Sequence, residues 1–174
     1  VSEKSVVVLE VSSFQLETIG DFRPHIGAIL NITPDHLDRH GTFAAYRKAK
    51  LRIAENQSSE QYLVMNREDR ESASISPDTQ AEVKWFSTSE RVGQNATWVT
   101  GNSLWMEHRG KEAQVVATRD ILIPGPHNLQ NAAAAALMAS LLGIDPAVIA
   151  RVLKSFPGVE HRIERCGTVA GVNF

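Results

Sequence analysis

The chain has 174 residues, of which 43% are hydrophobic and 22% charged, an ordinary balance for a globular domain with its own core. A net charge of −2 and a pI near 6.3 exclude the basic surface that nucleic acids or anionic lipids require. The single cysteine, Cys166, excludes an internal disulfide, and no apolar run reaches the roughly 18 residues of a membrane span. We therefore expect a soluble cytoplasmic protein.

The first half of the chain predicts alternating strands and helices. Continuous apolar runs rich in Val and Ile are typical of parallel strands covered on both faces, and they occupy residues 5–11 and 26–32, with further strands at 61–66 and 83–87. Helices are expected in FQLETIG, in TPDHLDRH with Thr33 as its N-cap and Pro34 at its first position, and over 43–56 behind Thr42.

The second half begins with short alternating segments over residues 85–123, which predict antiparallel hairpins. Helices are expected in GPHNLQNAAAAALMASLLG and, capped by Asp145, in DPAVIARVLKSF; HRIERCG and TVAGVNF return to strand. Together these elements predict an α/β fold with a doubly wound, mostly parallel sheet flanked by helices and a small antiparallel β subregion. We expect one domain over residues 1–174.

A carboxylate interrupts the first predicted strand at Glu10, where burial is costly unless a partner or a metal ion compensates. In open α/β sheets, ligands bind beyond the carboxyl ends of the strands. Neighbouring first and second strands would bring Glu10, Ser12 and His36 to the same edge. A carboxylate and an imidazole can begin a divalent-metal site, although a buried ion pair and a capped turn explain them equally well.

The segment DHLDRH raises a second possibility, because His36 and His40 lie four residues apart, as zinc ligands on a helix do. A metal-dependent hydrolase would then use both histidines with Glu10 and Asp35. No glutamate follows the first histidine, however, and Gly41 ends the helix at once. A solvated, charged turn over residues 38–40 is the favoured interpretation.

Lys50 lies on the apolar face of the predicted helix at 43–56. At about 3.6 residues per turn, it shares that face with Phe43, Tyr46 and Ile53, whereas Lys48 points away. A lysine in this position must extend its amine to water, find an anion or lose its charge. A neutral amine can also react with carbon dioxide to form a carbamate, and the residues alone leave these choices open.

Two amides and an arginine are candidates for nucleotide contacts. Asn128 and Asn131 lie three apart near the start of a predicted helix. Asn128 could cap the helix with Asn131 as an ordinary polar residue, or the amide of Asn131 could recognise the edge of an adenine. Arg162 precedes a predicted strand and could serve a phosphate or stack on a base. The 174 residues contain no P-loop motif, since the only Gly-Lys pair, at 110–111, is followed by Glu112.

Five motifs in a fixed order resemble the central domain of the Mur ligases, ATP-dependent amide-forming enzymes of peptidoglycan precursor synthesis. They are EVSSFQLE, LNITPDHLDRH, YRKAKLRI, GPHNLQNAAAA and FPGVEHRIE, and together they span nearly the whole chain. SSFQLE is most similar to the branch that adds D-glutamate to UDP-N-acetylmuramoyl-L-alanine. A folate polyglutamylating ligase of the same architecture, a metal-dependent hydrolase and a non-catalytic binding module are the alternatives.

The resemblance implies a role for particular side chains. Glu10 and His36 would be Mg²⁺ ligands, and a carbamate on Lys50 would help to hold a second Mg²⁺. The UDP-sugar substrate would be contacted by Ser12, Gln15 and His36. ATP would be contacted by Asn131 and Arg162, in a pocket shaped by His127 and Asn128.

The implied reaction is the activation of a carboxylate. ATP would phosphorylate the L-alanine carboxylate of the sugar substrate to an acyl phosphate, which the amine of D-glutamate then attacks, with Mg²⁺ offsetting the charge. The family's P-loop, its UDP-binding N-terminal domain and its C-terminal domain are expected to lie outside this chain. We therefore expect the 174 residues alone to be inactive, and the parent enzyme to be a monomer that binds neither nucleic acid nor membrane.

Overall fold

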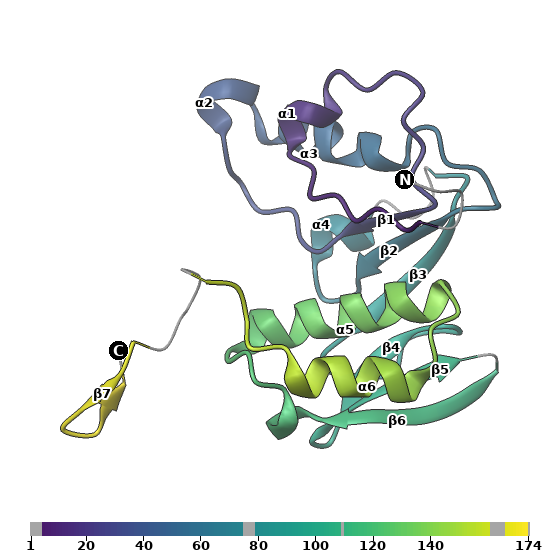
Figure 1. Cartoon of the computed structure of the whole chain (residues 1–174). Helices are drawn as coiled ribbons and strands as arrows, with labels where there is room; N and C mark the ends of the chain where they lie inside the picture. The colour runs from purple at the N-terminus through teal and green to yellow at the C-terminus, as the bar shows by residue number, and fades with distance from the viewer. Residues whose placement is uncertain (1–4, 75–78, 109, 161–165, 174) are drawn as a thin grey trace. The chain divides into compact units, whose positions relative to one another are not determined.

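The computed structural model describes residues 5–74, 79–108, 110–160 and 166–173 (Figure 1). The chain divides into two compact units: unit 1 comprises Val1–Met65 and Asp69–Val83, and unit 2 comprises Asn66–Glu68 and Lys84–Phe174. The main sheet has the strand order β1-β2-β3-β4-β5-β6, the order of the sequence, and includes both parallel and antiparallel pairs. The expected α/β fold is thereby confirmed.

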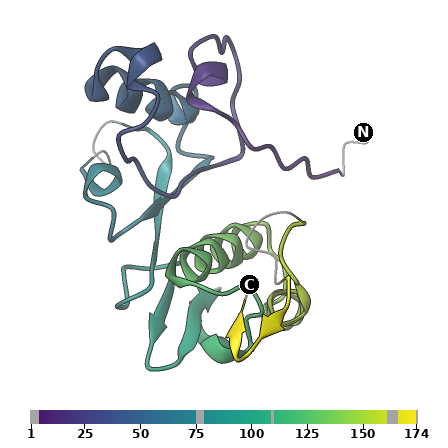
Figure 2. The same cartoon turned by 90° about the vertical axis from the view of Figure 1, so that its left-hand side faces the viewer.

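Unit 1 combines two parallel strands with short helices. β1 (Ile26–Ile29) runs parallel to β2 (Tyr62–Asn66), with Ile26 opposite Tyr62. The helical elements are α1 (Ser13–Leu16), α2 (Leu37–His40), α3 (Phe43–Leu51), the 3-10 turn η1 (Arg52–Ala54) and α4 (Arg70–Ala73). Both α1 and α2 pack against α3, as Figures 1 and 2 show, and these three helices are called the helical cluster below.

Unit 2 is a small sheet covered by two long helices. β3 (Glu82–Ser87) enters it and runs parallel to β4 (Thr97–Thr100), which continues as an antiparallel meander through β5 (Ser103–His108) and β6 (Lys111–Ala117). The turn η3 (Thr118–Asp120) leads to α5 (Pro126–Leu141) and α6 (Pro146–Ser155), which lie side by side. α5 packs on β4 and β5, and α6 packs on β6, so the predicted hairpins and both helices are confirmed.

Small side chains bring α5 close to the sheet of unit 2. The buried hydroxyl of Thr97 donates a hydrogen bond of 2.8 Å to the backbone carbonyl of Ala133. A larger side chain at position 133 would obstruct this hydrogen bond. Met106, directly opposite Thr97, and Leu104 are fully buried on the same face. The alanine run therefore serves close packing as well as helix formation.

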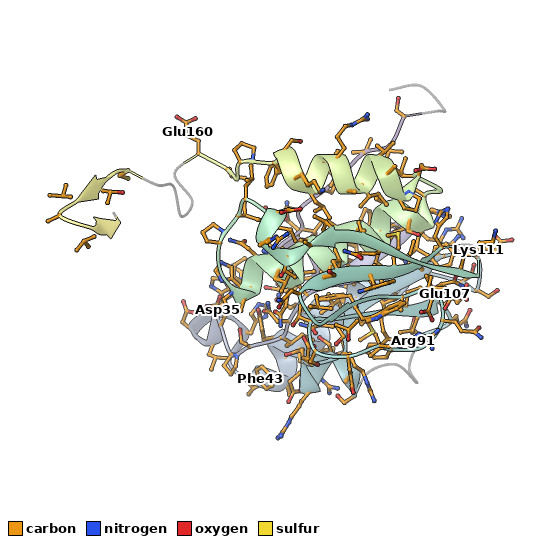
Figure 3. All side chains as sticks on the ribbon, turned by 90° about the horizontal axis from the view of Figure 1, so that it is seen from below. Asp35, Phe43, Arg91, Glu107, Lys111 and Glu160 are labelled. Carbon is orange, nitrogen blue, oxygen red and sulfur yellow. The ribbon has the colours of Figure 1, made fainter. Side chains whose placement is uncertain are left out.

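The other face of this sheet carries a pair of tryptophans. Trp98 lies directly opposite Trp105, and the loop residues Val92 and Ala96 pack on them. The guanidinium of Arg91 lies 5.5 Å from the centre of the Trp98 ring and forms ion pairs with Glu107 at 3.5 Å and with Glu112 at 2.6 Å (Figure 3). Residues of the loop before β4 thus pack on this face of the sheet.

The predicted strand over residues 5–11 is wrong. The segment has no regular secondary structure, and Val8 is 89% exposed. A strand needs a neighbour to pair its backbone groups. Among the described residues, β1 pairs only with β2, so residues 5–11 do not add a strand to its other edge. Apolar composition alone therefore misidentified an exposed segment as a buried strand.

The helix boundaries near residues 33–56 also differ from the prediction. α2 begins only at Leu37, and its N-cap is His36 in the left-handed conformation with φ 50°, so Thr33 does not cap it. Thr42 caps α3 as expected, its hydroxyl accepting from the N–H of Ala45. The α-helix stops at Leu51 and continues as the 3-10 turn η1, and the side chains of Arg52 and Asn56 bond to backbone carbonyls of the loop after α1.

The C-terminal predictions are confirmed in part. Asp145 caps α6 by accepting from the N–H of Ala147 at 2.8 Å, with Pro146 at the first helical position. Residues 168–173 form the hairpin of β7 (Thr168–Val169) and β8 (Val172–Asn173) instead of one strand. Most of HRIERCG lies outside the described residues. None of the helices in the described part of the chain is long and apolar enough to cross a membrane.

Candidate functional site

α1 presents the two predicted substrate contacts at its N-terminus. Ser12 is the N-cap, and its hydroxyl accepts from the N–H of Gln15 at 3.3 Å. The Gln15 side-chain oxygen accepts in return from the backbone N–H of Ser12 at 2.9 Å, which completes a capping box. Both residues are exposed. The capping box fixes the Gln15 side chain and, among the described residues, leaves its amide N–H groups unpaired, so they can donate to a ligand.

His36 stands at the start of α2 in a strained conformation. It is one of the few residues other than glycine with positive φ, a conformation that such residues adopt only at a cost. Asp35 supports it, since Oδ1 accepts from the His36 backbone N–H at 2.8 Å and Oδ2 lies 3.4 Å from Nε2. The His36 side chain is 51% exposed, so the imidazole is accessible to a ligand.

Lys50 projects from α3 and is half-buried, as its position on the apolar face predicted. Its Nζ lies 5.4 Å from the centre of the Tyr46 ring, and Tyr46 itself is buried. No ion pair with an acidic side chain is formed by Lys50 within the described residues. The amine is therefore close to an aromatic face and has no carboxylate partner.

Glu10 does not occupy the buried position that was predicted for it. It lies in the irregular segment before α1 and is exposed. In the part of the chain that the structure describes, no hydrogen bond or ion pair joins Glu10 to His36 or Lys50. The expected gathering of Glu10, Ser12 and His36 at one sheet edge depended on a strand that does not form, so the structure brings Ser12, Gln15, His36 and Lys50 into the helical cluster without Glu10.

His40 was misjudged as part of a solvated turn. Its side chain is only 2% exposed, with Nε2 3.0 Å from the hydroxyl of Ser13 and Nδ1 3.0 Å from a carboxylate oxygen of Glu17. Because both ring nitrogens are engaged, the hydrolase hypothesis loses His40 as a metal ligand. No group of three or more His, Cys, Asp or Glu side chains in the described ranges is arranged to hold a metal ion.

No local sequence signal predicted the contacts of His40. Ser13 and His40 are 27 positions apart, and their contact depends on how α1 and α2 pack against α3. Glu17 is the C-cap of α1 in the structure, whereas the predicted helix FQLETIG continued past it.

The start of α5 in unit 2 carries the predicted nucleotide contacts. Asn128 does not cap the helix: its side-chain amide donates to the carbonyl of Pro124 at 2.7 Å, and the cap is Gly125. Asn131, partly buried, donates to Oδ1 of Asn128 at 3.3 Å. His127 is exposed beside them, while Arg162 lies outside the described residues.

Gly125 is required at its position by the backbone. Its φ of 98° is one that side chains rarely adopt, and an added Cβ would lie 3.0 Å from the His127 ring. The turn therefore places His127 directly over the backbone of Gly125 and starts α5 at Pro126. The two asparagines are consequently held by one turn and one hydrogen-bond chain.

Comparisons with known proteins agree with this arrangement of motifs. A family model described as "Mur ligase middle domain" matches residues 1–139. The chain is 44% identical over 173 residues to the UDP-N-acetylmuramoylalanine–D-glutamate ligase of Thermoanaerobacter sp. strain X514, covering 99% of this chain and 38% of that protein. It is 41% identical over 167 residues to the ligase of the same name from Koribacter versatilis, covering 96% and 37%.

Solved structures share the fold. A UDP-N-acetylmuramoyl-L-alanyl-D-glutamate–2,6-diaminopimelate ligase matches with a TM-score of 0.69 at 19% identity, covering 91% of this chain and 34% of that one. MurF from Acinetobacter baumannii matches with a TM-score of 0.66 at 22% identity, covering 85% and 32%. The chain thus spans less than two fifths of the length of the relatives that it matches.

Proposed function

Because the chain belongs to the Mur ligase middle-domain family, we propose that it is the central part of an ATP-dependent ligase that joins D-glutamate to UDP-N-acetylmuramoyl-L-alanine. The observation that carries this proposal is the 44% identity over 99% of the chain to a ligase of that name. The whole enzyme would be a monomer that acts in the cytoplasm.

The helical cluster of unit 1 is proposed to hold the sugar-peptide substrate and Mg²⁺. Ser12 and Gln15 are exposed at the start of α1, and the capping box restricts Gln15 before a ligand arrives, which lowers the entropic cost of binding. His36 is equally accessible at the start of α2. Substrate hydroxyl, amide and phosphate groups are the partners that these side chains suit.

Unit 1 contains side chains of the types that can bind Mg²⁺. Glu10 contributes an exposed carboxylate, and His36 contributes an imidazole nitrogen held by Asp35. A carbamate on Lys50 would add the anionic oxygens that a magnesium ion prefers, which a protonated amine cannot supply. When bound, Mg²⁺ would offset the negative charge between the phosphates and the substrate carboxylate.

Unit 2 is proposed to recognise ATP through the start of α5. Asn131 uses one N–H for Asn128, which leaves its second N–H and its oxygen available for the edge of an adenine. Arg162 and His127 are assigned to the same ligand on the family resemblance. The proposed reaction requires no protein nucleophile, because the residues of this chain bind and orient the reacting groups.

The test is a substrate panel on the full-length ligase that contains this chain. With ATP, Mg²⁺ and UDP-N-acetylmuramoyl-L-alanine, we expect phosphate release that depends on D-glutamate and fails with L-glutamate. Phosphate release with a folate and L-glutamate instead would identify the folate branch. The 174 residues alone, assayed in parallel, are expected to release no phosphate.

A further inference from the structure

The His40 side chain contacts all three members of the helical cluster. It belongs to α2, its ring stacks on Phe14 of α1 with centres 5.2 Å apart and planes inclined by 11°, and it meets the edge of Tyr46 of α3 at 5.3 Å. Only 2% of this side chain is exposed. A single imidazole therefore joins three short elements, two of which have four residues each.

The hydrogen bonds of His40 fix the orientation of its ring. The carboxylate of Glu17 can only accept, so Nδ1 carries the proton that it receives. The hydroxyl of Ser13 can donate to a bare Nε2 or accept from a protonated one. Both ring nitrogens of His40 therefore have a hydrogen-bond partner.

Glu17 is itself held from a second side. Arg39 lies 3.7 Å from its other carboxylate oxygen, and the Arg39 guanidinium also lies 5.2 Å from the centre of the Phe14 ring. The acceptor of the His40 bond is thus oriented by a residue of α2 as well. These contacts restrict how α1 can slide or rotate relative to α2.

A continuous column of ring contacts passes through His40. The His36 ring lies 5.0 Å from Phe14, Phe14 lies 5.2 Å from His40, His40 lies 5.3 Å from Tyr46, and Nζ of Lys50 lies 5.4 Å from Tyr46. The proposed metal ligands His36 and Lys50 stand at its two ends. Packed rings with His40 among them therefore connect the two proposed ligands.

We propose that His40 is a positioning residue, which through Ser13 and Glu17 holds α1 in place so that the substrate contacts Ser12 and Gln15 keep a fixed spacing from His36 and Lys50. This inference rests on the proposed function of the helical cluster. The His40 side chain bonds Ser13 and Glu17 of α1, so its substitution is expected to change the position of α1 and of the substrate contacts at its start.

The test compares His40→Asn, His40→Phe and Ser13→Ala with wild type in the full-length ligase. Asparagine can still donate to Glu17 but loses Ser13, and phenylalanine keeps the ring column but loses both bonds. Ser13→Ala is the mildest change, so it still tests the inference if a His40 variant fails to fold. His108→Phe is the matched control, because it breaks a histidine–serine bond of 2.9 Å between Nδ1 of His108 and Ser140 in unit 2.

Three readouts are measured: kinetics, calorimetric binding of UDP-N-acetylmuramoyl-L-alanine and of Mn²⁺, and the imidazole N–H signal in nitrogen-15 NMR. We expect His40→Phe, which frees α1 but keeps the ring column, to lower kcat/KM for UDP-N-acetylmuramoyl-L-alanine by up to about 100-fold, with Mn²⁺ affinity unchanged. Ser13→Ala should show a smaller loss in the same direction, with KM for ATP unchanged. The protected N–H signal of His40 should weaken in Ser13→Ala, and His108→Phe should change none of these.

Two outcomes separate this inference from the proposed function. An active wild type whose His40→Phe and Ser13→Ala variants keep the wild-type kcat/KM for UDP-N-acetylmuramoyl-L-alanine would overturn the positioning role and leave the ligase function intact. A wild type without ligase activity that still binds this substrate more tightly than the variants do would refute the function and support the positioning role. A wild type that neither reacts with this substrate nor binds it would overturn both.

Discussion

Lys50 is the residue whose chemistry depends most on its immediate surroundings. Its half-buried amine faces the ring of Tyr46 and, among the described residues, has no acidic partner. A protonated amine is attracted to such a ring face, whereas a neutral amine can form a carbamate. Only the carbamate offers oxygen atoms to a cation, so the two states predict different roles.

Replacing Lys50 with alanine in the full-length ligase should lower kcat by more than about 100-fold, because the loss of a ligand exceeds the effect of residues behind it. Added short carboxylic acids should restore part of the activity by supplying the missing oxygens. Carbon-13 NMR in labelled bicarbonate should show a carbamate signal that the variant lacks. Lys48→Ala, an exposed change on the same helix, is the control and should remain active. A fully active Lys50→Ala enzyme would contradict the carbamate.

At the scale of elements, α6 offers a clean test of local sequence signals. Asp145 accepts from the N–H of Ala147 at the first turn, and no tertiary contact is needed for that bond. Asp145→Ala should lower the free energy of unfolding by about 1 kcal/mol, as measured by urea denaturation. Asp145→Ser keeps a capping oxygen and should recover most of this loss. Equal destabilisation by both variants would mean that the cap contributes little.

Glu68 joins the turn after β2 to the end of β3. Its Oε1 accepts from the hydroxyl of Ser87 at 2.7 Å, the N–H of Thr88 at 2.7 Å and the hydroxyl of Ser89 at 2.8 Å, and Oε2 accepts from Gln130 of α5. Partial burial of the carboxylate raises its pKa, but the hydrogen bonds from Ser87, Ser89 and Thr88 outweigh burial and hold the pKa below the ordinary 4.5.

This lowered pKa gives a pH dependence with a defined sign. The unfolded state binds a proton more readily, so the stability that Glu68 contributes is present above pH 4.5 and is lost as the pH falls through the lower folded value. Glu68→Gln should therefore lower the urea midpoint more at pH 6 than at pH 3. Parallel pH profiles for the two proteins would contradict this role.

At the scale of the whole molecule, the exposed apolar segment before α1 affects solubility more than folding. Val6, Val7, Val8 and Leu9 are each 61–89% exposed and strongly favour β structure. Such a run can pair with the same segment of another chain. Val8→Lys should slow aggregation of the 174-residue chain in light scattering while leaving the urea midpoint unchanged. A large fall in the midpoint would show instead that Val8 packs in the folded state.

Local signals predicted a large part of the fold. The caps Thr42 and Asp145, the meander of β4 to β6 and the alanine-rich α5 depend on interactions within a few residues. The candidate residues Ser12, Gln15, His36 and Lys50 were likewise found from motifs, and the structure brings them into one helical cluster. Their assigned roles remain proposals.

The sequence by itself determined the α/β class, the helix caps and the family, because capping, periodicity and ordered motifs are written into neighbouring residues. Only the tertiary structure decided that residues 5–11 form no strand and that Glu10 is exposed, since a strand depends on a partner elsewhere in the chain. It alone revealed that the His40 side chain is buried and bonded to Ser13, because Ser13 lies 27 positions away and meets it only when the helices pack together.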